Sequence, residues 1–273
     1  MKERSLRDLF HLIKQVLPDE QEIIFVSPET TAGDALKMMQ ERGFNQLPVV
    51  EADCHEVFGA FSYRSLALGL ARLSPKVKEP LSLPVEEFLE RLEFAQISDE
   101  LVALLDEFDI KDAVLVGSRE RLLGIVTTID VLRYFYRVAS PYVLLREIEL
   151  AVRELIRESI DDEGLRECVN MTLKKHYEEL KKEVPTRVED MTAEDYVTLL
   201  RFRGTWERFT DSFGKNQDIV IGKLARVPGL RNDVFHFRRE LTMAEYEELR
   251  ECRDWLLTRI RRVEAKRRGA SGG

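Results

Sequence analysis

The chain has 273 residues, of which 44% are hydrophobic and 34% charged, so it can form one large or two modest domains with buried cores. Its 50 acidic and 42 basic residues give a net charge of -8. The protein as a whole is therefore not attracted electrostatically to nucleic acid or to an anionic membrane. The three cysteines lie far apart, with neither disulfide-framework nor zinc-ligand spacing, which fits a reducing compartment and excludes a disulfide-rich or zinc-stabilised fold.

Residues 1–19 have a helical pattern of apolar residues that is interrupted by His11, Lys14 and Gln15. A signal peptide would have a continuous apolar segment here. Nowhere does an uncharged apolar run approach the ~20 residues that a membrane-spanning helix requires. We therefore expect an N-terminal helix over residues 1–19 in a soluble, cytoplasmic protein without a membrane partner.

The next part of the chain contains an internal repeat. Each copy has an amphipathic helical segment, a short apolar run, a turn, and a second apolar run that leads into another helix. The matching segments are Ala32–Arg42 with Asp99–Asp109, Phe44–Val50 with Ile110–Val116, and Val57–Leu66 with Leu122–Val131. Short β-rich runs that alternate with helical patterns predict a small α/β domain made of two similar halves.

A candidate binding site lies where the last strand of the second copy meets its helix. Thr127 and Thr128 stand beside the unpaired N–H groups of the helix start, an arrangement that suits a phosphate. Asp130, in the first turn, can accept hydrogen bonds from both hydroxyls of a ribose, and Gly124 allows a ligand to approach the backbone. The structural alternative is a threonine that caps the helix and a carboxylate that balances the helix dipole.

The two copies resemble a pair of CBS domains, the arrangement called a Bateman module. The resemblance covers residues 20–138, with domains at 20–75 and 85–138, and is most specific in the stretch GIVTTID. It implies small mixed sheets flanked by helices and an adenosine-type regulatory ligand such as AMP, ADP or ATP. In that family the Thr and Asp of the motif contact phosphate and ribose, which implies these roles for Thr127 and Asp130. Ile110 and Lys111 match positions that line the same pocket.

The first copy departs from this pattern at Ser65, which stands where the second copy has Asp130. A serine hydroxyl does not replace a carboxylate that bridges two ribose hydroxyls, because charge-assisted hydrogen bonds are roughly twice as strong as neutral ones. We therefore predict one competent site per chain, centred on Asp130, and a weak or structural site at Ser62.

After Pro141 the pattern becomes helical, with apolar residues at three- and four-residue steps. Thr192 with Asp195, and Thr242 with Glu245, have the spacing of capping boxes. We expect an all-α bundle over residues 142–265 and a flexible tail over 266–273.

The charge divides near the same boundary. Residues 1–141 contain 16 basic and 24 acidic residues, whereas residues 142–273 contain 26 of each. Within the second half, residues 223–268 contain 13 basic and 8 acidic residues. Any contact with RNA is therefore expected on the helical half.

A second candidate site is the pair Arg231 and His236. Five residues at about 100° each place the two side chains about 140° apart on a helix, so one apolar face cannot hold both. Histidine can accept the proton of an RNA 2′-hydroxyl near neutral pH, and arginine can stabilise charge on the phosphorane without a metal. The alternative is that His236 bonds a neighbouring carbonyl and that Arg231 pairs with an acid such as Asp233.

The run LRNDVFHFR and its surroundings resemble the HEPN superfamily, whose hallmark is Arg, four to six residues, then His, often with Asn after the Arg. Arg231, Asn232 and His236 match this motif. The resemblance implies a helical domain that dimerises, and many such domains are metal-independent endoribonucleases with a composite active site from two protomers.

The two resemblances together predict an endoribonuclease that acts as a homodimer through both parts of the chain and is regulated by an adenosine ligand. No metal or other cofactor is expected for catalysis. One alternative is a non-catalytic adenine-nucleotide sensor whose helical half dimerises or docks a partner. Another is a ribonuclease toxin that an antitoxin controls.

Overall fold

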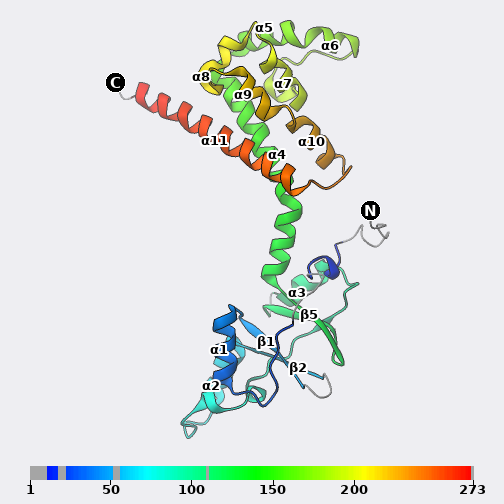
Figure 1. The fold of residues 1–273 in the computed structure, drawn as a ribbon, viewed down its shortest axis with the longest axis vertical. Coiled ribbons are helices and arrows are strands. Elements are labelled where there is room, and N and C mark those ends of the chain that lie inside the picture. The colour runs from blue at the N-terminus through cyan, green and yellow to red at the C-terminus, as the bar shows by residue number, and fades with distance from the viewer. Residues whose placement is uncertain (1–10, 18–22, 52–55, 109–110, 272–273) are drawn as a thin grey trace. The chain divides into compact units, whose positions relative to one another are not determined.

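The computed structural model describes residues 11–17, 23–51, 56–108 and 111–271. The chain divides into two compact units, residues 1–136 and 137–273 (Figure 1). The first unit contains small sheets with helices and the second is built from helices, so the predicted division into an α/β part and a helical part is confirmed.

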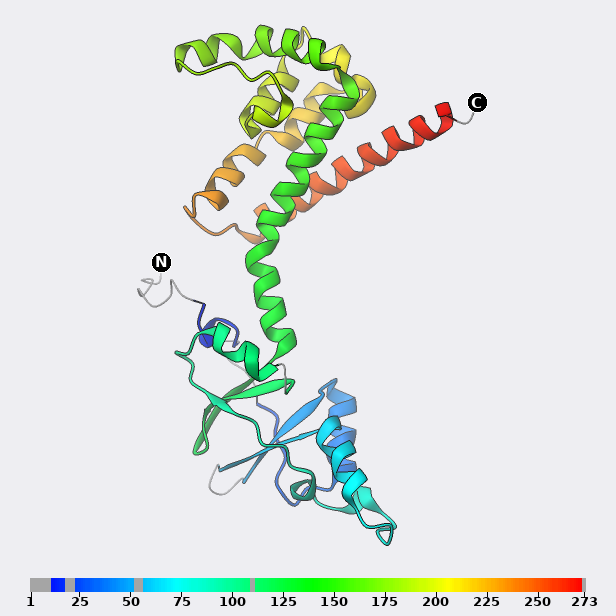
Figure 2. The same ribbon diagram turned by 180° about the vertical axis from the view of Figure 1, so that it is seen from behind.

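The first repeat is a two-stranded antiparallel sheet with helices packed on it. Its elements are α1 (Ala32–Arg42), β1 (Gln46–Val50), β2 (Val57–Ser62) and α2 (Tyr63–Arg72). β1 pairs with β2, and Val26 adds a parallel bridge to Val49 of β1. Ala35 and Met39 lie one turn apart on α1 and are fully buried in the core of this repeat. α1 and α2 lie side by side (Figures 1 and 2).

The second repeat has the same order of elements. They are β3 (Phe94–Ala95), the 3₁₀ helix η5 (Leu101–Leu104), α3 (Leu105–Phe108), β4 (Ala113–Ser118), β5 (Arg121–Thr127) and α4 (Thr128–Ser159). β3 runs parallel to β4, as Val26 does to β1, and β4 pairs antiparallel with β5. The predicted duplication is therefore present in the strand pairing as well as in the sequence.

The two repeats share buried contacts through their sheets. A cluster of apolar residues joins them: Val50, Val57, Ala60, Leu92, Ala113 and Leu115. The connection between the repeats includes the 3₁₀ helices η3 (Pro80–Ser82) and η4 (Val85–Phe88). Val85 and Phe88 are buried in the core of the first repeat, so the segment after residue 85, predicted to open the second domain, packs with the first.

The N-terminal segment packs against the second repeat. Within the described residues 11–17 the helix is a short 3₁₀ turn, η2 (Ile13–Gln15), and residues 1–10 of the predicted helix over 1–19 lie outside the described part. Ile13 is fully buried in the core of the second repeat. His11 Nδ1 lies 2.6 Å from the hydroxyl of Tyr134, and that hydroxyl donates to Gln15 at 2.9 Å. The segment is therefore part of the domain and not a separate helix before it.

Gly59 in β2 is required by a close backbone approach. Its φ is +153°, and a Cβ at this position would lie 2.5 Å from the carbonyl oxygen of Glu90. Ala60 and Glu90 exchange backbone hydrogen bonds of 2.9 and 2.8 Å there.

Gly59→Ala is therefore expected to destabilise the fold by about 1–3 kcal/mol in chemical denaturation. Gly222→Ala, in α9 (Gln217–Leu224) with open space around it, is the control and should be neutral or stabilising. Equal stabilities of the two variants would contradict this explanation.

The second unit is a helical bundle with one core. After the C-terminal part of α4 its elements are α5 (Asp162–Thr172), α6 (Lys174–Glu179), η6 (Val188–Asp190), α7 (Ala193–Arg201), η7 (Trp206–Phe209), α8 (Thr210–Phe213), α9, α10 (Val227–Phe235) and α11 (Met243–Ser271). Ile148, Leu155 and Phe209 are among its largest fully buried side chains. Thr192 and Asp195 form the predicted capping box at the start of α7.

One of the two long helices, α11, extends further than the sequence predicts. α11 continues to Ser271, so residues 266–271 of the predicted tail are helical, and residues 272–273 lie outside the described part (Figure 2). α4 contains Pro141 in its interior. A proline there cannot donate a hydrogen bond to the carbonyl of Arg137, and the Ser140 hydroxyl donates to that carbonyl at 3.2 Å instead. No helix of the described residues has the length and apolar character needed to cross a bilayer.

Candidate functional site

Thr127 and Asp130 form a reciprocal cap where β5 ends and α4 begins. The backbone N–H and the hydroxyl of Thr127 donate to Asp130 Oδ2 at 3.0 and 2.5 Å. The Asp130 N–H donates to Thr127 Oγ1 at 3.3 Å. These are the hydrogen bonds of a capping box, so the structural role considered for this pair is confirmed.

The same geometry leaves the other Asp130 oxygen available. Oδ1 lies 3.9 Å from Arg133 Nη1, beyond hydrogen-bond distance, and the Asp130 side chain is 35% exposed. Oδ2 is fixed by the helix start, whereas Oδ1 has a distant ion pair with Arg133 and no hydrogen bond to the described residues. The cap and a ribose contact are therefore compatible.

The other residues predicted for this site lie around the same junction. Gly124 is buried in β5, opposite Val116 of β4. The Thr128 N–H donates to the carbonyl of Asp112 at 3.3 Å, which brings the segment before β4 next to the helix start. Lys111 is half-buried there, with Nζ 3.8 Å from Glu93. Ile110 lies outside the described residues.

The corresponding position of the first repeat is already occupied by a side chain. Ser62 and Ser65 form a reciprocal cap on α2. The Ser62 hydroxyl also donates to Glu90 Oε2 at 3.0 Å, and Arg64 donates to Glu90 Oε1 at 2.7 Å. The Glu90 carboxylate is only 16% exposed. It stands where a phosphate would meet the Ser62 hydroxyl, and its negative charge opposes an anionic ligand.

The comparisons with known proteins concern the first unit. A family model described as "CBS domain" matches residues 6–71. The chain thus contains a CBS domain at residues 6–71. The match begins within the segment 1–19, although Ile13 of that segment packs into the core of the second repeat.

Three relatives indicate the extent of the similarity. The chain is 28% identical over 116 residues to cystathionine beta-synthase from Dictyostelium discoideum, an alignment that covers 42% of this chain and 23% of that protein. A crystal structure of CBSX2 in complex with AMP aligns with TM-score 0.39 and 20% identity over 45% of this chain and 94% of its own. A CBS domain pair in complex with 5′-methylthioadenosine and S-adenosyl-L-methionine aligns with TM-score 0.39 and 22% identity over 46% and 96%. The chain spans about a quarter of the length of the curated relative.

Arg231 lies in α10, a helix that begins at Val227 and has Pro228 in its first turn, where proline is tolerated. Its guanidinium lies 4.8 Å from the ring centre of Phe235. Its Nε is buried and has no hydrogen-bond partner among the described residues. Nη1 lies 3.5 Å from Asn232 Oδ1. A buried N–H without an acceptor is uncommon, and it leaves this guanidinium with donor capacity for an anion.

His236 is the C-cap residue of α10 and not part of the helix. Its side chain is exposed, and within the described residues its imidazole makes no hydrogen bond, so the neighbouring carbonyl considered as its partner is not found. Asp233, considered as a partner for Arg231, instead binds Arg239 at 2.8 Å. The prediction that one apolar face does not hold both side chains is correct, because Arg231 is half-buried and His236 is exposed. His236 is exposed, however, because α10 ends there.

The chain after His236 is held by an ionic clasp, made of Asp233, Arg239, Glu245 and Arg226. Arg239 contacts Glu245 through both terminal nitrogens at 2.7 and 2.8 Å and Asp233 at 2.8 Å. Arg226 reaches Glu245 at 3.3 Å. Glu245 also caps α11 through Thr242, as predicted from the sequence. The clasp fixes the path of residues 236–242 between α10 and α11.

The clasp predicts an acid-sensitive contribution to stability. Hydrogen bonds from Arg239, and then from the Thr242 backbone, lower the pKa of Glu245 to about 2. The depressed pKa means that the stabilisation is complete above the ordinary value of 4.5 and is lost as the pH falls from there toward about 2. We expect Glu245→Gln to lower Tm at pH 7, with a difference from wild type that narrows below pH 4.5.

The matched control for this prediction is Glu247→Gln on the same helix, since the Glu247 side chain is 57% exposed and, among the described residues, pairs only with Arg250. It should leave Tm nearly unchanged. A Tm difference for Glu245→Gln that stays constant between pH 7 and pH 3 would show that the carboxylate charge is not responsible.

Proposed function

We propose that the N-terminal unit is an adenine-nucleotide sensor and that the helical unit is a metal-independent endoribonuclease acting as a homodimer. The observation that carries the sensor is the Asp130 carboxylate at the start of α4, whose Oδ2 is fixed by Thr127 and whose Oδ1 forms no hydrogen bond with the described residues. The CBS domain in the chain supports this assignment. The ligands of the solved relatives, AMP and S-adenosyl-L-methionine, give the first compounds to test.

The nucleotide contacts follow from the chemistry of the groups. Asp130 Oδ1 accepts hydrogen bonds from the ribose hydroxyls while Oδ2 stays in the helix cap. The Thr127 and Thr128 hydroxyls and the helix start receive the phosphate, and Lys111 and Arg133 supply positive charge. One nucleotide binds per chain, because Glu90 holds the first-repeat position.

The ribonuclease assignment is supported by the chemical state of the Arg231 and His236 side chains. His236 is exposed and is a proton acceptor in its neutral form, which makes it the base for the RNA 2′-hydroxyl. Arg231 is half-buried and forms no ion pair with the described residues, and its permanently charged guanidinium stabilises the negative charge that grows on the phosphorus oxygens. Asn232, next to Arg231, positions the guanidinium through its side-chain carbonyl. The 2′-oxygen attacks phosphorus, the 5′-oxygen leaves, and the products are a 2′,3′-cyclic phosphate and a 5′-hydroxyl.

The test uses the full-length protein and labelled single-stranded RNA in excess EDTA, with and without AMP, ADP, ATP or S-adenosyl-L-methionine. We expect cleavage in EDTA, a 2′,3′-cyclic phosphate product, and a rate that changes when one of these ligands is bound. Nucleotide binding without RNA cleavage would favour the non-catalytic sensor. A cleavage rate that none of these ligands changes would show that nucleotide binding does not regulate cleavage, and it would favour the ribonuclease toxin controlled by an antitoxin.

A further inference from the structure

Beside His236 the helical unit has a cluster of three aromatic side chains, the half-buried Tyr142 and the exposed Phe235 and Phe237. The Phe237 side chain is 81% exposed and that of Phe235 is 41% exposed. The Tyr142 ring lies 5.5 Å from the Phe235 ring and 6.5 Å from the Phe237 ring. All three belong to the unit that contains Arg231.

The backbone holds Phe237 in an unfavourable conformation. Its φ is +52°, in the left-handed region where glycine is usual at the end of a helix. The Phe237 N–H donates to the carbonyl of Val234 at 3.2 Å, and the Arg238 N–H donates to that of Asp233 at 2.9 Å, the two bonds of a Schellman motif. The positive φ of this bulky residue is unfavourable, and its ring is exposed to solvent. Phe237 therefore stabilises the fold neither through its backbone conformation nor through burial of its side chain. Such strain is found most often at functional positions.

Positive charge is interleaved with these rings. Arg231 stacks on Phe235, and Arg238, next to Phe237, is exposed and forms no ion pair with the described residues. By contrast, Arg239 is fully engaged in the clasp. Aromatic residues and arginine also gather at protein interfaces. Single-stranded nucleic acid binds where cations follow its backbone and aromatic rings stack on its bases, and the position of these rings beside His236 favours this second use.

We infer that Phe237, together with Phe235 and Tyr142, is a stacking platform for a base of single-stranded RNA next to the phosphate bound by Arg231 and His236. This inference rests on the proposed ribonuclease and adds the class of substrate and the residue that selects it. A duplex keeps its bases stacked on one another, so the platform selects unpaired RNA. Arg238 contacts a neighbouring phosphate.

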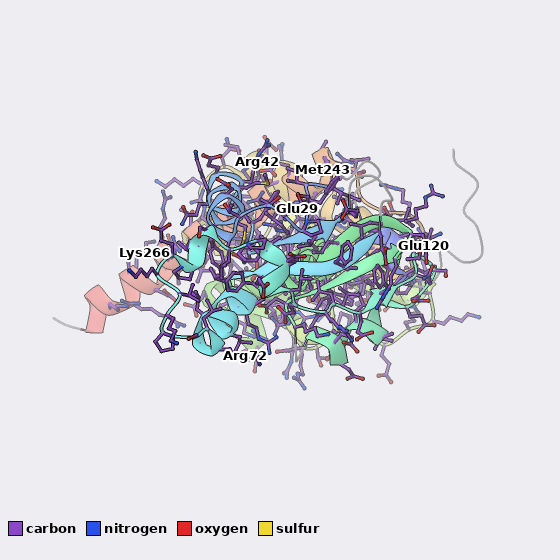
Figure 3. All side chains as sticks on the ribbon, turned by 90° about the horizontal axis from the view of Figure 1, so that it is seen from below. Glu29, Arg42, Arg72, Glu120, Met243 and Lys266 are labelled. Carbon is purple, nitrogen blue, oxygen red and sulfur yellow. The ribbon has the colours of Figure 1, made fainter. Side chains whose placement is uncertain are left out.

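The experiment measures the affinity of the full-length protein for a fully 2′-O-methylated RNA that contains 2-aminopurine, a probe that has no 2′-hydroxyl to be cleaved. Phe237→Ala is expected to bind about tenfold more weakly and to lose the fluorescence change of stacked 2-aminopurine, while Phe237→Trp keeps both. The control is Met243→Ala at the start of α11 (Figure 3), because this apolar side chain is equally exposed, at 82%, but has no ring. Its affinity should equal that of wild type.

Three results would overturn the inference. The first is that the wild type does not bind the probe. The second is that wild type and Phe237→Ala bind it with equal affinity. The third is that Phe237→Ala changes the sedimentation coefficient of the protein but not its affinity for RNA, which would show that the rings form a protein interface. The ribonuclease is judged separately with unmodified RNA. If the probe binds by stacking but unmodified RNA is not cleaved, only the proposed ribonuclease is refuted. If RNA is cleaved and Phe237→Ala leaves KM unchanged, only the stacking platform is refuted.

Discussion

Replacing His236 by alanine is expected to slow RNA cleavage by about 10²- to 10⁴-fold, the usual contribution of a general base. The exposed imidazole makes no hydrogen bond with the described residues, so its loss should change the free energy of unfolding by less than about 0.5 kcal/mol. Arg231→Lys should cost a comparable factor, because lysine keeps the charge but cannot bind two phosphate oxygens with a planar fork. Single-turnover cleavage with saturating enzyme measures both effects.

The matched control is His176→Ala in α6, since His176 is also exposed and belongs to the same helical unit. It should cleave RNA at the wild-type rate. Cleavage by His236→Ala at the wild-type rate would remove His236 from the mechanism. Equal loss in both histidine variants would indicate a nonspecific effect on the preparation.

Replacing Asp130 by asparagine is expected to weaken binding of the adenine nucleotide by about 10- to 100-fold, because a hydrogen bond to a charged group contributes about 1.5–3 kcal/mol. Asparagine retains a carbonyl oxygen that can accept from the Thr127 N–H, so the cap of α4 survives while the charge is removed. Isothermal titration calorimetry with AMP and with S-adenosyl-L-methionine measures the change directly.

Asp34→Asn provides a close control. Asp34 is the first-turn carboxylate of α1, its N–H donates to Thr31 Oγ1 at 3.1 Å, and the Thr31 hydroxyl donates to it at 2.7 Å. It therefore has the same local chemistry as Asp130 in a different helix start. Its substitution should leave nucleotide affinity unchanged. Unchanged affinity in Asp130→Asn as well would place the nucleotide elsewhere on the chain.

The elements with strong local signals were predictable. The helix Ala32–Arg42 has the predicted bounds because Thr31 caps its start and Gly43, with φ +71°, ends it. The duplication predicted the strand pairs of both repeats, since matching sequences bury matching faces. The core that receives residues 85–88 could not be predicted, because the apolar pattern at Val85 and Phe88 indicates a buried face but not which repeat covers it.

Long-range side-chain contacts account for what the sequence did not predict at the sites. Glu90 is 28 residues from Ser62, and no local pattern links a carboxylate in a connecting segment to a hydroxyl at a helix start. The clasp is similar, because Arg226 lies in the turn before α10 and Glu245, 19 residues later, lies in α11. The exposed ring of Phe237 also escaped prediction, since phenylalanine in an apolar run indicates burial and only the backbone conformation reveals otherwise.

In the proposed nucleotide site, the cap between Thr127 and Asp130 would link ligand binding to local folding. Asp130 closes the first turn of α4, a helix of 32 residues, and first turns open and close with a small free energy. A ligand that binds Oδ1 only when Oδ2 is in the cap selects the closed turn, and its binding free energy then opposes fraying at this end of the helix. Amide hydrogen exchange of the first α4 turn would thus be a direct readout of nucleotide occupancy, without any change in the average position of the backbone.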